Sequence, residues 1–269
     1  MTLSPEITQL HASAYRDPAQ LPPGAVLVVG TGSSGCQIAE ELHRSNRRVY
    51  LSVGRHQRVR RRYRGRDIMF WLVATGRFDR TLDSFPGRVM PPPVVITGVD
   101  GGHDIDLRRF AGDGMVLLGR VTEGAGSTLA FRDDVNEVLA LADRSAADFD
   151  AAVEAYVRDA RDDEFEEADL EPSVPMRLRD FRTPSSLDLK DAGVASVIWC
   201  TGYAFDLDWV RLPIFDDRGT PVQQRGVTSA PGLYFLGLHW MHTFKSGTLF
   251  GVGDDAAYLA QHIAQTAAS

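Results

Sequence analysis

A glycine-rich turn between an apolar run and a helix-forming stretch constrains this chain more than any other feature. Residues 26–29 read Val-Leu-Val-Val and lead into Gly-Thr-Gly-Ser-Ser-Gly at 30–35, and Cys36–Leu42 then favours a helix. A β-branched run, a G-x-G-x-x-G turn and a helix together form the unit that holds the pyrophosphate of a dinucleotide. The sequence therefore predicts a nucleotide-binding strand–turn–helix; the alternative is a tight turn that binds nothing.

Each glycine of the turn has a separate expected purpose. Gly30 permits the tight turn, Gly32 lets the backbone approach the phosphates, and Gly35 lets the helix pack close to the strand. The helix N-terminus adds free N–H groups and a partial positive charge that favour an anion. The candidate pyrophosphate contacts are Gly30, Thr31, Gly32, Ser33, Ser34 and Gly35.

The end of the next predicted strand indicates which dinucleotide binds. Residues 48–53 read as this strand, and an NAD site usually has Asp or Glu at its end for the ribose hydroxyls. Here Ser52 and Arg55 occupy that region, and no carboxylate residue occurs between Ser52 and Asp67. Because an arginine suits the 2′-phosphate of NADP, we expect NADPH to be the preferred cofactor, with Ser52 and Arg55 as contacts.

A basic run continues beyond Arg55 and could be a solvated loop or a nucleic-acid patch. The chain has a net charge of −7, and Tyr63 is the single aromatic residue within the run, so we expect no nucleic-acid partner. The arginines of this run are Arg58, Arg60, Arg61, Arg62, Arg64 and Arg66.

Composition is that of an ordinary globular protein of 269 residues, 43% hydrophobic and 24% charged. We expect no membrane association, because no apolar stretch reaches spanning length. The N-terminus lacks a signal-peptide pattern, and Cys36 and Cys200 form neither a C-x-x-C pair nor a zinc pattern, which favours the cytoplasm and predicts no metal site. Cys36 could have a lowered thiol pKa at the helix start, but a buried packing role is the favoured interpretation.

Alternating short strands and helices predict an α/β fold with a mainly parallel sheet. A polar stretch over residues 1–24 is expected to be a linker or lid, and residues 161–186 an irregular connection. Further strands are predicted at 94–97, 115–118, 195–199 and 233–236, a hairpin at 121–131, helices at 66–75, 133–160 and 247–268, and a helical turn at 107–111.

Several segments resemble flavin-containing monooxygenases and related flavoprotein NAD(P)H oxidoreductases. Residues 26–35 resemble the second glycine motif of that family, which binds NADPH. Residues 11–15 resemble the back half of its signature F-x-G-x-x-x-H-x-x-x-[FY], although Pro5 and Ile7 replace the Phe and Gly of the front half. Residues 198–203 resemble the family's ATGY strand-to-turn.

Residues 231–237 resemble the strand after which the chain returns to the flavin, and Leu238 stands where related disulfide reductases carry Asp. The resemblance therefore favours the monooxygenase branch, and it adds Thr201, Gly202 and Gly237 to the expected cofactor contacts. It implies a Rossmann-type, three-layer NAD(P)-binding domain at 22–205 after a lead at 1–21, and the C-terminal remnant of a FAD-binding domain at 206–269.

The implied mechanism is hydride transfer from NADPH to FAD, followed by activation of oxygen. No catalytic residue is assigned; His239, His242 and Lys245 could face the flavin or the substrate, but packing and surface hydrogen bonding are favoured for each of them. Asp254 and Asp255 are expected to complete the N-terminus of the last helix.

The family's first glycine motif, which binds the ADP half of FAD, has no counterpart in this sequence. We therefore expect FAD to bind only with a complementary FAD-binding half, in a partner chain or in a missing N-terminal half. A fragment, a split gene and a decayed gene remain open, as does a homo-oligomer. The alternative functions are a non-catalytic NADP-binding module and a freestanding dehydrogenase, which is disfavoured because Lys190 and Lys245 are the only lysines and neither completes a Tyr-x-x-x-Lys pair.

Overall fold

The computed structural model describes residues 2–91, 94–160, 165 and 182–267. The chain divides into two compact units, which are described separately. The first consists of Met1–Ile68 and Pro92–Tyr203, and the second of Met69–Pro91 and Ala204–Ser269. The sequence had assigned residues 22–205 to a single domain, whereas residues 69–91 cluster with the C-terminal segment.

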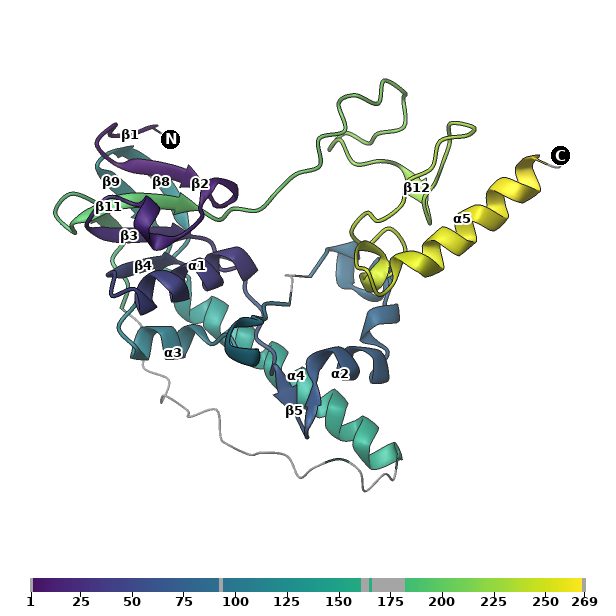
Figure 1. Cartoon of the computed structure of the whole chain (residues 1–269), viewed down its shortest axis with the longest axis horizontal. Coiled ribbons are helices and arrows are strands. Elements are labelled where there is room, and N and C mark those ends of the chain that lie inside the picture. The colour runs from purple at the N-terminus through teal and green to yellow at the C-terminus, as the bar shows by residue number, and fades with distance from the viewer. Residues whose placement is uncertain (1, 92–93, 161–164, 166–181, 268–269) are drawn as a thin grey trace. The chain divides into compact units, whose positions relative to one another are not determined.

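A five-stranded sheet forms the centre of the first unit (Figure 1). Every neighbouring pair of its strands is parallel, in agreement with the predicted α/β class. Helix α1 (Ser33–Arg44) connects two neighbouring strands of this sheet and completes the predicted βαβ unit. In spatial order the strands are β2 (Thr8–His11), β11 (Val194–Trp199), β3 (Ala25–Val29), β4 (Val49–Ser52) and β7 (Val116–Leu118).

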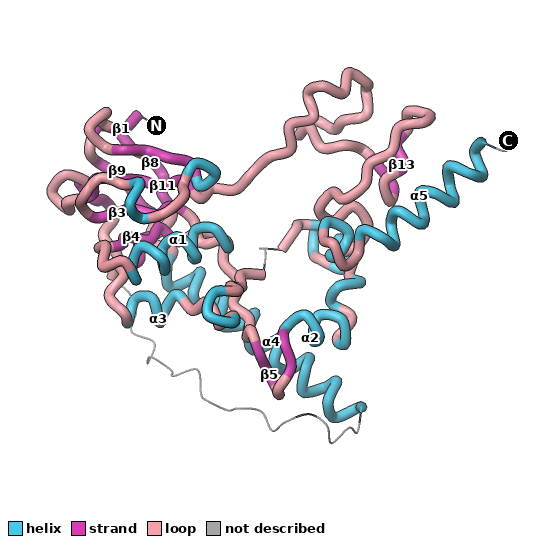
Figure 2. The backbone as a smooth tube through the Cα atoms, in the orientation of Figure 1, coloured by secondary structure: helices cyan, strands magenta, loops and turns pink. Residues whose placement is uncertain are grey.

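Helices cover one face of this sheet. Side chains of alternate positions, such as Val26 and Val28, pack with Ala39 of α1, Phe110 of α3 (Leu107–Gly112) and Val138 of α4 (Val135–Ala160). This alternation is expected of a strand whose successive residues point to opposite faces. Helices α1 and α4 were predicted as helices and α3 as a helical turn; Figure 2 shows all three beneath the strands.

A second sheet covers the other face. Leu27 and Val197 of the central strands pack with Leu129 and Phe131 of this sheet. The layers are therefore helix, sheet and sheet, so that the third layer is a sheet rather than a second set of helices. Its strands, in spatial order, are β1 (Thr2–Leu3), β8 (Val121–Gly126), β9 (Thr128–Phe131) and β10 (Ser186–Asp188), with β8 and β9 forming the predicted hairpin.

The N-terminal segment is not a linker. Its strand β1 pairs with β8, and its strand β2 pairs with β11 in parallel. The segment is polar because both strands lie at sheet edges and are partly exposed. Two short 3₁₀ turns follow, at Ala12–Ala14 and Pro18–Gln20.

The arginine-rich segment is packed against acidic residues rather than forming a solvated loop. Arg60 Nε lies 2.9 Å from an oxygen of Asp150, and Arg64 Nη2 lies 2.7 Å from Glu154, both on α4. The hydrogen bond from Arg64 holds the pKa of Glu154 below its ordinary value. Within this segment β5 (Arg62–Tyr63) and β6 (Arg66–Asp67) form a small hairpin. The ion pairs with α4 explain how so basic a segment fits an acidic chain.

Residues 94–97 do not form the predicted strand. Val94 and Ile96 make only isolated bridges, with Gln57 and Asp104. A 3₁₀ turn at Val99–Gly101 follows at once, so the segment is too short and too sharply bent to join the sheet. The predicted connection at 161–186 lies largely outside the described residues, and its last residue begins β10.

The second unit contains α2 (Ile68–Ala74), which begins at its boundary, and α5 (Val252–Ala267), both predicted. Its strands are the short pair β12 (Gln223–Gln224) and β13 (Val227–Thr228). The predicted strand at 233–236 does not form: Tyr234 makes one isolated bridge with Val227 of β13, a strand of only two residues. Short 3₁₀ turns lie at Arg77–Asp79, Leu82–Ser84, Pro86–Arg88 and Phe244–Gly247.

Candidate functional site

A cleft of about 610 Å³ opens at the carboxyl ends of the central strands of the first unit. Ligands of open α/β sheets bind at this edge. The residues that line it come from the ends of β3, β4, β7 and β11: Val29, Gly30, Thr31, Gly32, Ser52, Val53, Gly54, Arg55, Arg120, Val121, Trp199, Cys200, Thr201 and Gly202.

The three glycines of the turn have different surroundings. Gly30 has φ +113°, and a Cβ there would lie 2.4 Å from the Cys200 carbonyl oxygen. A Cβ on Gly35 would lie 1.9 Å from the Gly30 carbonyl oxygen, so this glycine is required for α1 to approach β3. By contrast, a Cβ on Gly32 would meet no described atom within 4 Å. The space beside Gly32 is open towards the cleft that this residue lines.

Helix α1 presents its N-terminus at this turn. Gly32 is its N-cap residue and makes no side-chain capping hydrogen bond. Residues Ser33–Gly35 form the first turn, where backbone N–H groups have no acceptor within a helix. These groups and the partial positive charge of the helix are suited to a phosphate.

Hydrogen bonds fix the loop that follows β4. The backbone N–H of Gly54 donates to Thr31 Oγ1 at 3.1 Å, which joins this loop to the glycine turn. The Ser52 hydroxyl is buried and donates to the Gly119 carbonyl at 2.8 Å. Ser52 thus lines the cleft while bonding the end of β7, and its oxygen retains acceptor capacity for a ligand.

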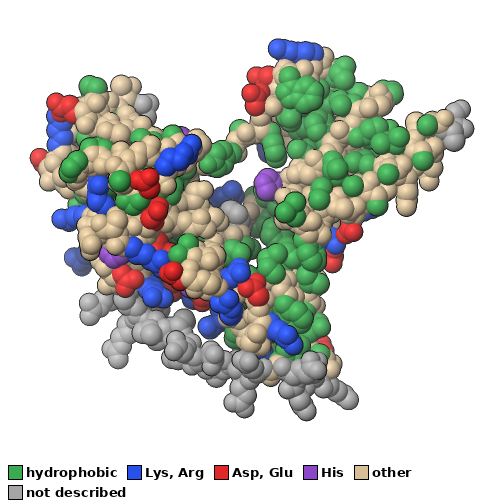
Figure 3. Space-filling model, viewed as in Figure 1, with side chains coloured by type: hydrophobic (Ala, Val, Ile, Leu, Met, Phe, Trp, Pro, Cys, Tyr) green, Lys and Arg blue, Asp and Glu red, His purple; other side chains and the backbone are tan. Residues whose placement is uncertain are grey.

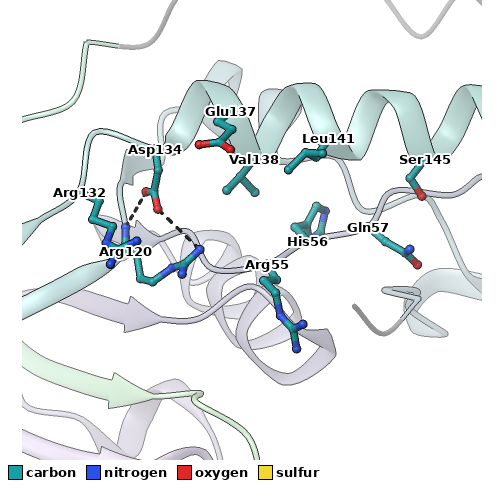
Figure 4. Close-up of a pocket in the computed structure, with 10 residues that line it drawn as sticks. All are labelled: Arg55, His56, Gln57, Arg120, Arg132, Asp134, Glu137, Val138, Leu141 and Ser145. Atoms are coloured by element: carbon teal, nitrogen blue, oxygen red, sulfur yellow. Dashed lines mark hydrogen bonds and ion pairs between the residues drawn. The ribbon is translucent and has the colours of Figure 1, made fainter. Parts of the chain in front are cut away.

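Arginine side chains lie at the rim of the cleft on the β4 and β7 side. Arg55 was predicted, but Arg120 was missed in the sequence. Arg120 lies two residues beyond the end of β7, and Arg55 lies three residues beyond the end of β4. The position of Arg120 just after a predicted parallel strand was therefore a usable sequence signal for a place at this edge of the sheet. Both arginines also line a neighbouring pocket of about 410 Å³ (Figure 4). There the Arg120 guanidinium lies 3.7 Å from Asp134.

The segment after β11 is held by the N-terminal segment. The backbone N–H of Ser13 donates to His11 Nδ1, so His11 Nε2 carries the hydrogen and donates to the Gly202 carbonyl at 3.1 Å. The His11 ring also meets the Tyr203 ring edge-on, with centroids 5.1 Å apart. The segments at 11–15 and 198–203, selected separately in the sequence, therefore meet beside the cleft.

The cleft brings together most of the residues predicted to bind a cofactor. Gly237 instead belongs to the second unit, where it has φ +81°. The residues that line the cleft are Gly30, Thr31, Gly32, Ser52, Arg55, Thr201 and Gly202, with Ser33, Ser34 and Gly35 in the adjoining turn of α1.

Both cysteines are free thiols. Burial raises the pKa of Cys36, and its thiol donates to the Thr31 carbonyl at 3.5 Å. Burial also raises the pKa of Cys200 to about 12. Cys36 is therefore a packing residue beneath the turn rather than an activated thiol.

The candidate polar residues of the second unit bond within that unit. Lys245 Nζ lies 2.9 Å from Asp79 and 2.8 Å from Asp254. Asp254 and Asp255 lie in the first turn of α5, as predicted, and the buried Asp255 accepts from Arg225 at 3.2 Å. His242 Nδ1 lies 3.7 Å from the same carboxylate. These partners agree with a structural role for Lys245.

The described residues contain no group of three or more His, Cys, Asp or Glu side chains that could hold a metal ion. Within them, no helix is long and apolar enough to cross a membrane.

Comparisons with known proteins agree with this fold. Residues 6–93 match the family model of flavin-binding monooxygenase-like proteins. Two oxidoreductases described as uncharacterised are similar over 97% of the chain: a CzcO-like protein of Geobacillus kaustophilus at 31% identity and CzcO of Bacillus subtilis at 27%. This chain spans 59% of the length of each.

A solved flavin-containing monooxygenase from Stenotrophomonas maltophilia has the same fold, with a TM-score of 0.53 at 16% identity. The alignment covers 97% of this chain and 56% of that one. The parallel sheet and glycine-lined cleft define a Rossmann-type α/β protein. The chain is therefore similar to flavin-binding monooxygenase-like proteins and related oxidoreductases, of which it spans little more than half the length.

Proposed function

We propose that this chain binds NADPH in the cleft of the first unit and serves as the reductant-binding part of a flavin-dependent oxidoreductase. The observation that supports it most is the open space beside Gly32 in front of the N-terminus of α1. A pyrophosphate fits there, because neither a side chain nor a capping group competes for the N–H groups.

The rim of the cleft supports NADPH over NADH. Arg55 and Arg120 lie after β4 and β7, where the ribose of the adenosine half is expected. Neither Asp nor Glu is among the described residues that line the cleft. Guanidinium groups form strong charge-assisted hydrogen bonds with phosphate. Bound NADPH would supply a hydride, while the role of this chain is to hold and orient the nucleotide.

The described residues do not fit the ADP half of FAD. Gly251-Val252-Gly253 also lies at the start of a helix, α5, but no described strand leads into it. We therefore assign no step involving flavin to this chain. In the proposal FAD is held by a complementary FAD-binding half, either elsewhere in a longer protein or in a partner chain.

Exposed apolar side chains in the second unit support such a partner half. Leu249 is fully exposed, and Trp209 is 72% exposed. Figure 3 shows apolar side chains gathered over α5 and the loops around β12. The segment 233–236 has the composition of a buried strand yet makes only one isolated bridge, from Tyr234 to Val227. A partner that supplied strands would cover apolar surface and complete this pairing.

Calorimetric titration with NADPH and NADH tests the nucleotide assignment. We expect the chain to bind NADPH more tightly, and Arg55→Ala to weaken NADPH binding by about ten- to a hundredfold because one charge-assisted hydrogen bond is lost. NADH binding should change little. Arg109→Ala, an exposed arginine on α3 outside the cleft, is the matched control. Equal affinities of the unmutated chain for the two nucleotides would contradict the proposal.

A further inference from the structure

The pocket adjoins the cleft and shares residues with it. It lies between the loop after β4 and the first turns of α4, and Arg55 and Arg120 line both spaces. Figure 4 shows His56 and Gln57 on the loop side and Val138 and Leu141 on α4. A ligand that occupies the glycine turn could therefore extend past the two arginines into this pocket.

Among the described residues that line the pocket, His56 has a buried side-chain atom without a hydrogen-bond partner. It is only 3% exposed, and its Nδ1 lies 2.9 Å from the Thr31 carbonyl oxygen. Because a carbonyl can only accept, Nδ1 carries the hydrogen and Nε2 presents a lone pair. That Nε2 atom is buried and has no hydrogen-bond partner.

The charge state of His56 favours an acceptor role. Burial lowers the pKa of its imidazole, so the ring is neutral near pH 7. A buried acceptor without a partner costs free energy, which a ligand that donates a hydrogen bond would recover. The group that would complete this bonding is therefore a hydrogen-bond donor, such as an amino group, rather than an anion.

The remaining walls suit a flat heterocycle. Val138 is buried and Leu141 is half exposed, and both project from the same side of α4. Exposed side chains change rotamer readily, so Leu141 can move aside as a ring enters. The arginines at the opening would face a phosphate attached next to that ring.

We propose that this side pocket receives the adenine ring of the dinucleotide and that His56 Nε2 accepts a hydrogen bond from its exocyclic 6-amino group. The inference rests on the proposed function and identifies His56 as a specificity-determining residue. The bond from His56 to Thr31 would also join adenine recognition to the glycine turn. Adenine fits better than nicotinamide, because the adenosine half carries the 2′-phosphate that the arginines would bind.

The decisive comparison uses NADPH and its analogue with hypoxanthine in place of adenine, titrated into the full chain by calorimetry. The analogue has an oxygen where adenine has its amino group, so it presents an acceptor to the lone pair of Nε2. We expect it to bind about tenfold more weakly or worse. If the chain binds NADPH and the analogue with equal affinity, the inference is overturned and the proposed function still stands.

A variant that fills the pocket provides the second arm. Leu141→Trp should weaken NADPH binding about tenfold or more, since its indole would occupy the space proposed for adenine. Ala151→Trp, at an exposed position of α4 outside the pocket, should leave the affinity for NADPH unchanged. Unchanged NADPH affinity in Leu141→Trp would overturn the inference. Failure of the unmutated chain to bind any nucleotide would overturn both the inference and the proposed function.

Discussion

The glycine turn shows how single residues define the proposed site. Position 30 requires glycine because a Cβ there would overlap the Cys200 carbonyl oxygen. Position 35 requires glycine because a Cβ there would overlap the Gly30 carbonyl oxygen. Gly32 meets no described protein atom, so packing does not require a glycine there. The absence of a side chain at Gly32 therefore has its simplest explanation in a ligand that approaches the backbone.

His56 should make stability depend on pH. Burial lowers its pKa in the folded state below the ordinary value of 6.5, so the unfolded chain binds the proton more readily. This contribution to stability is present above about pH 6.5 and is lost as the pH falls towards the folded-state pKa. Thermal unfolding followed between pH 8 and pH 5 should show a falling midpoint, and His56→Gln should reduce that slope. If the unfolding midpoint of the variant falls with pH as steeply as that of the wild type, this pH dependence does not come from His56.

At the scale of elements, the contact between α1 and β3 positions the cleft. Gly35 allows the first turn of the helix to approach the Gly30 carbonyl, and Cys36, Ala39 and Leu42 then pack on the sheet. We predict that Gly35→Ala lowers the free energy of unfolding by about 1–3 kcal/mol or more, because its Cβ overlaps backbone. Urea unfolding checks this. Wild-type stability in Gly35→Ala would show that the turn is less constrained than its geometry implies.

The elements that the sequence predicted correctly are those defined by local pattern. Residues 26–29 and 115–118 are apolar runs that end at glycine-containing turns, and 133–160 is a long helical stretch. The strand β2 was missed, because its place in the sheet depends on pairing with β11, far along the chain. The segment 233–236 was wrongly predicted as a strand, because its composition cannot report how long its neighbour is, and β13 offers only two residues for pairing.

The same contrast applies to the candidate site. The glycine motif and Arg55 were recognisable because the βαβ unit places them at fixed spacing. Arg120 was missed although its place after a predicted strand was a usable signal, whereas the side pocket could not be recognised, because it depends on α4 packing beside the β4 loop. The partners of the arginine-rich segment were equally hidden, since Asp150 and Glu154 are about ninety residues away in sequence.

At the scale of the whole molecule, we expect that this chain does not oxidise NADPH with FAD alone. Its exposed apolar residues, such as Trp209, Leu249 and Phe250, should cause self-association or binding of the dye ANS. Light scattering and fluorescence measure these properties. Adding a separate FAD-binding half that carries the missing glycine motif should restore flavin binding and NADPH oxidation. A monodisperse yellow protein with steady NADPH oxidation would contradict this account.

The most direct test of the central claim is calorimetric titration of NADPH into the unmutated chain and into Gly32→Ala. A Cβ at position 32 has room in the protein, so circular dichroism of the variant should match that of the wild type. The same Cβ would occupy the space proposed for the pyrophosphate, so NADPH binding should be abolished. Normal NADPH binding by a folded Gly32→Ala variant would show that the turn is structural and that the nucleotide site has been placed wrongly.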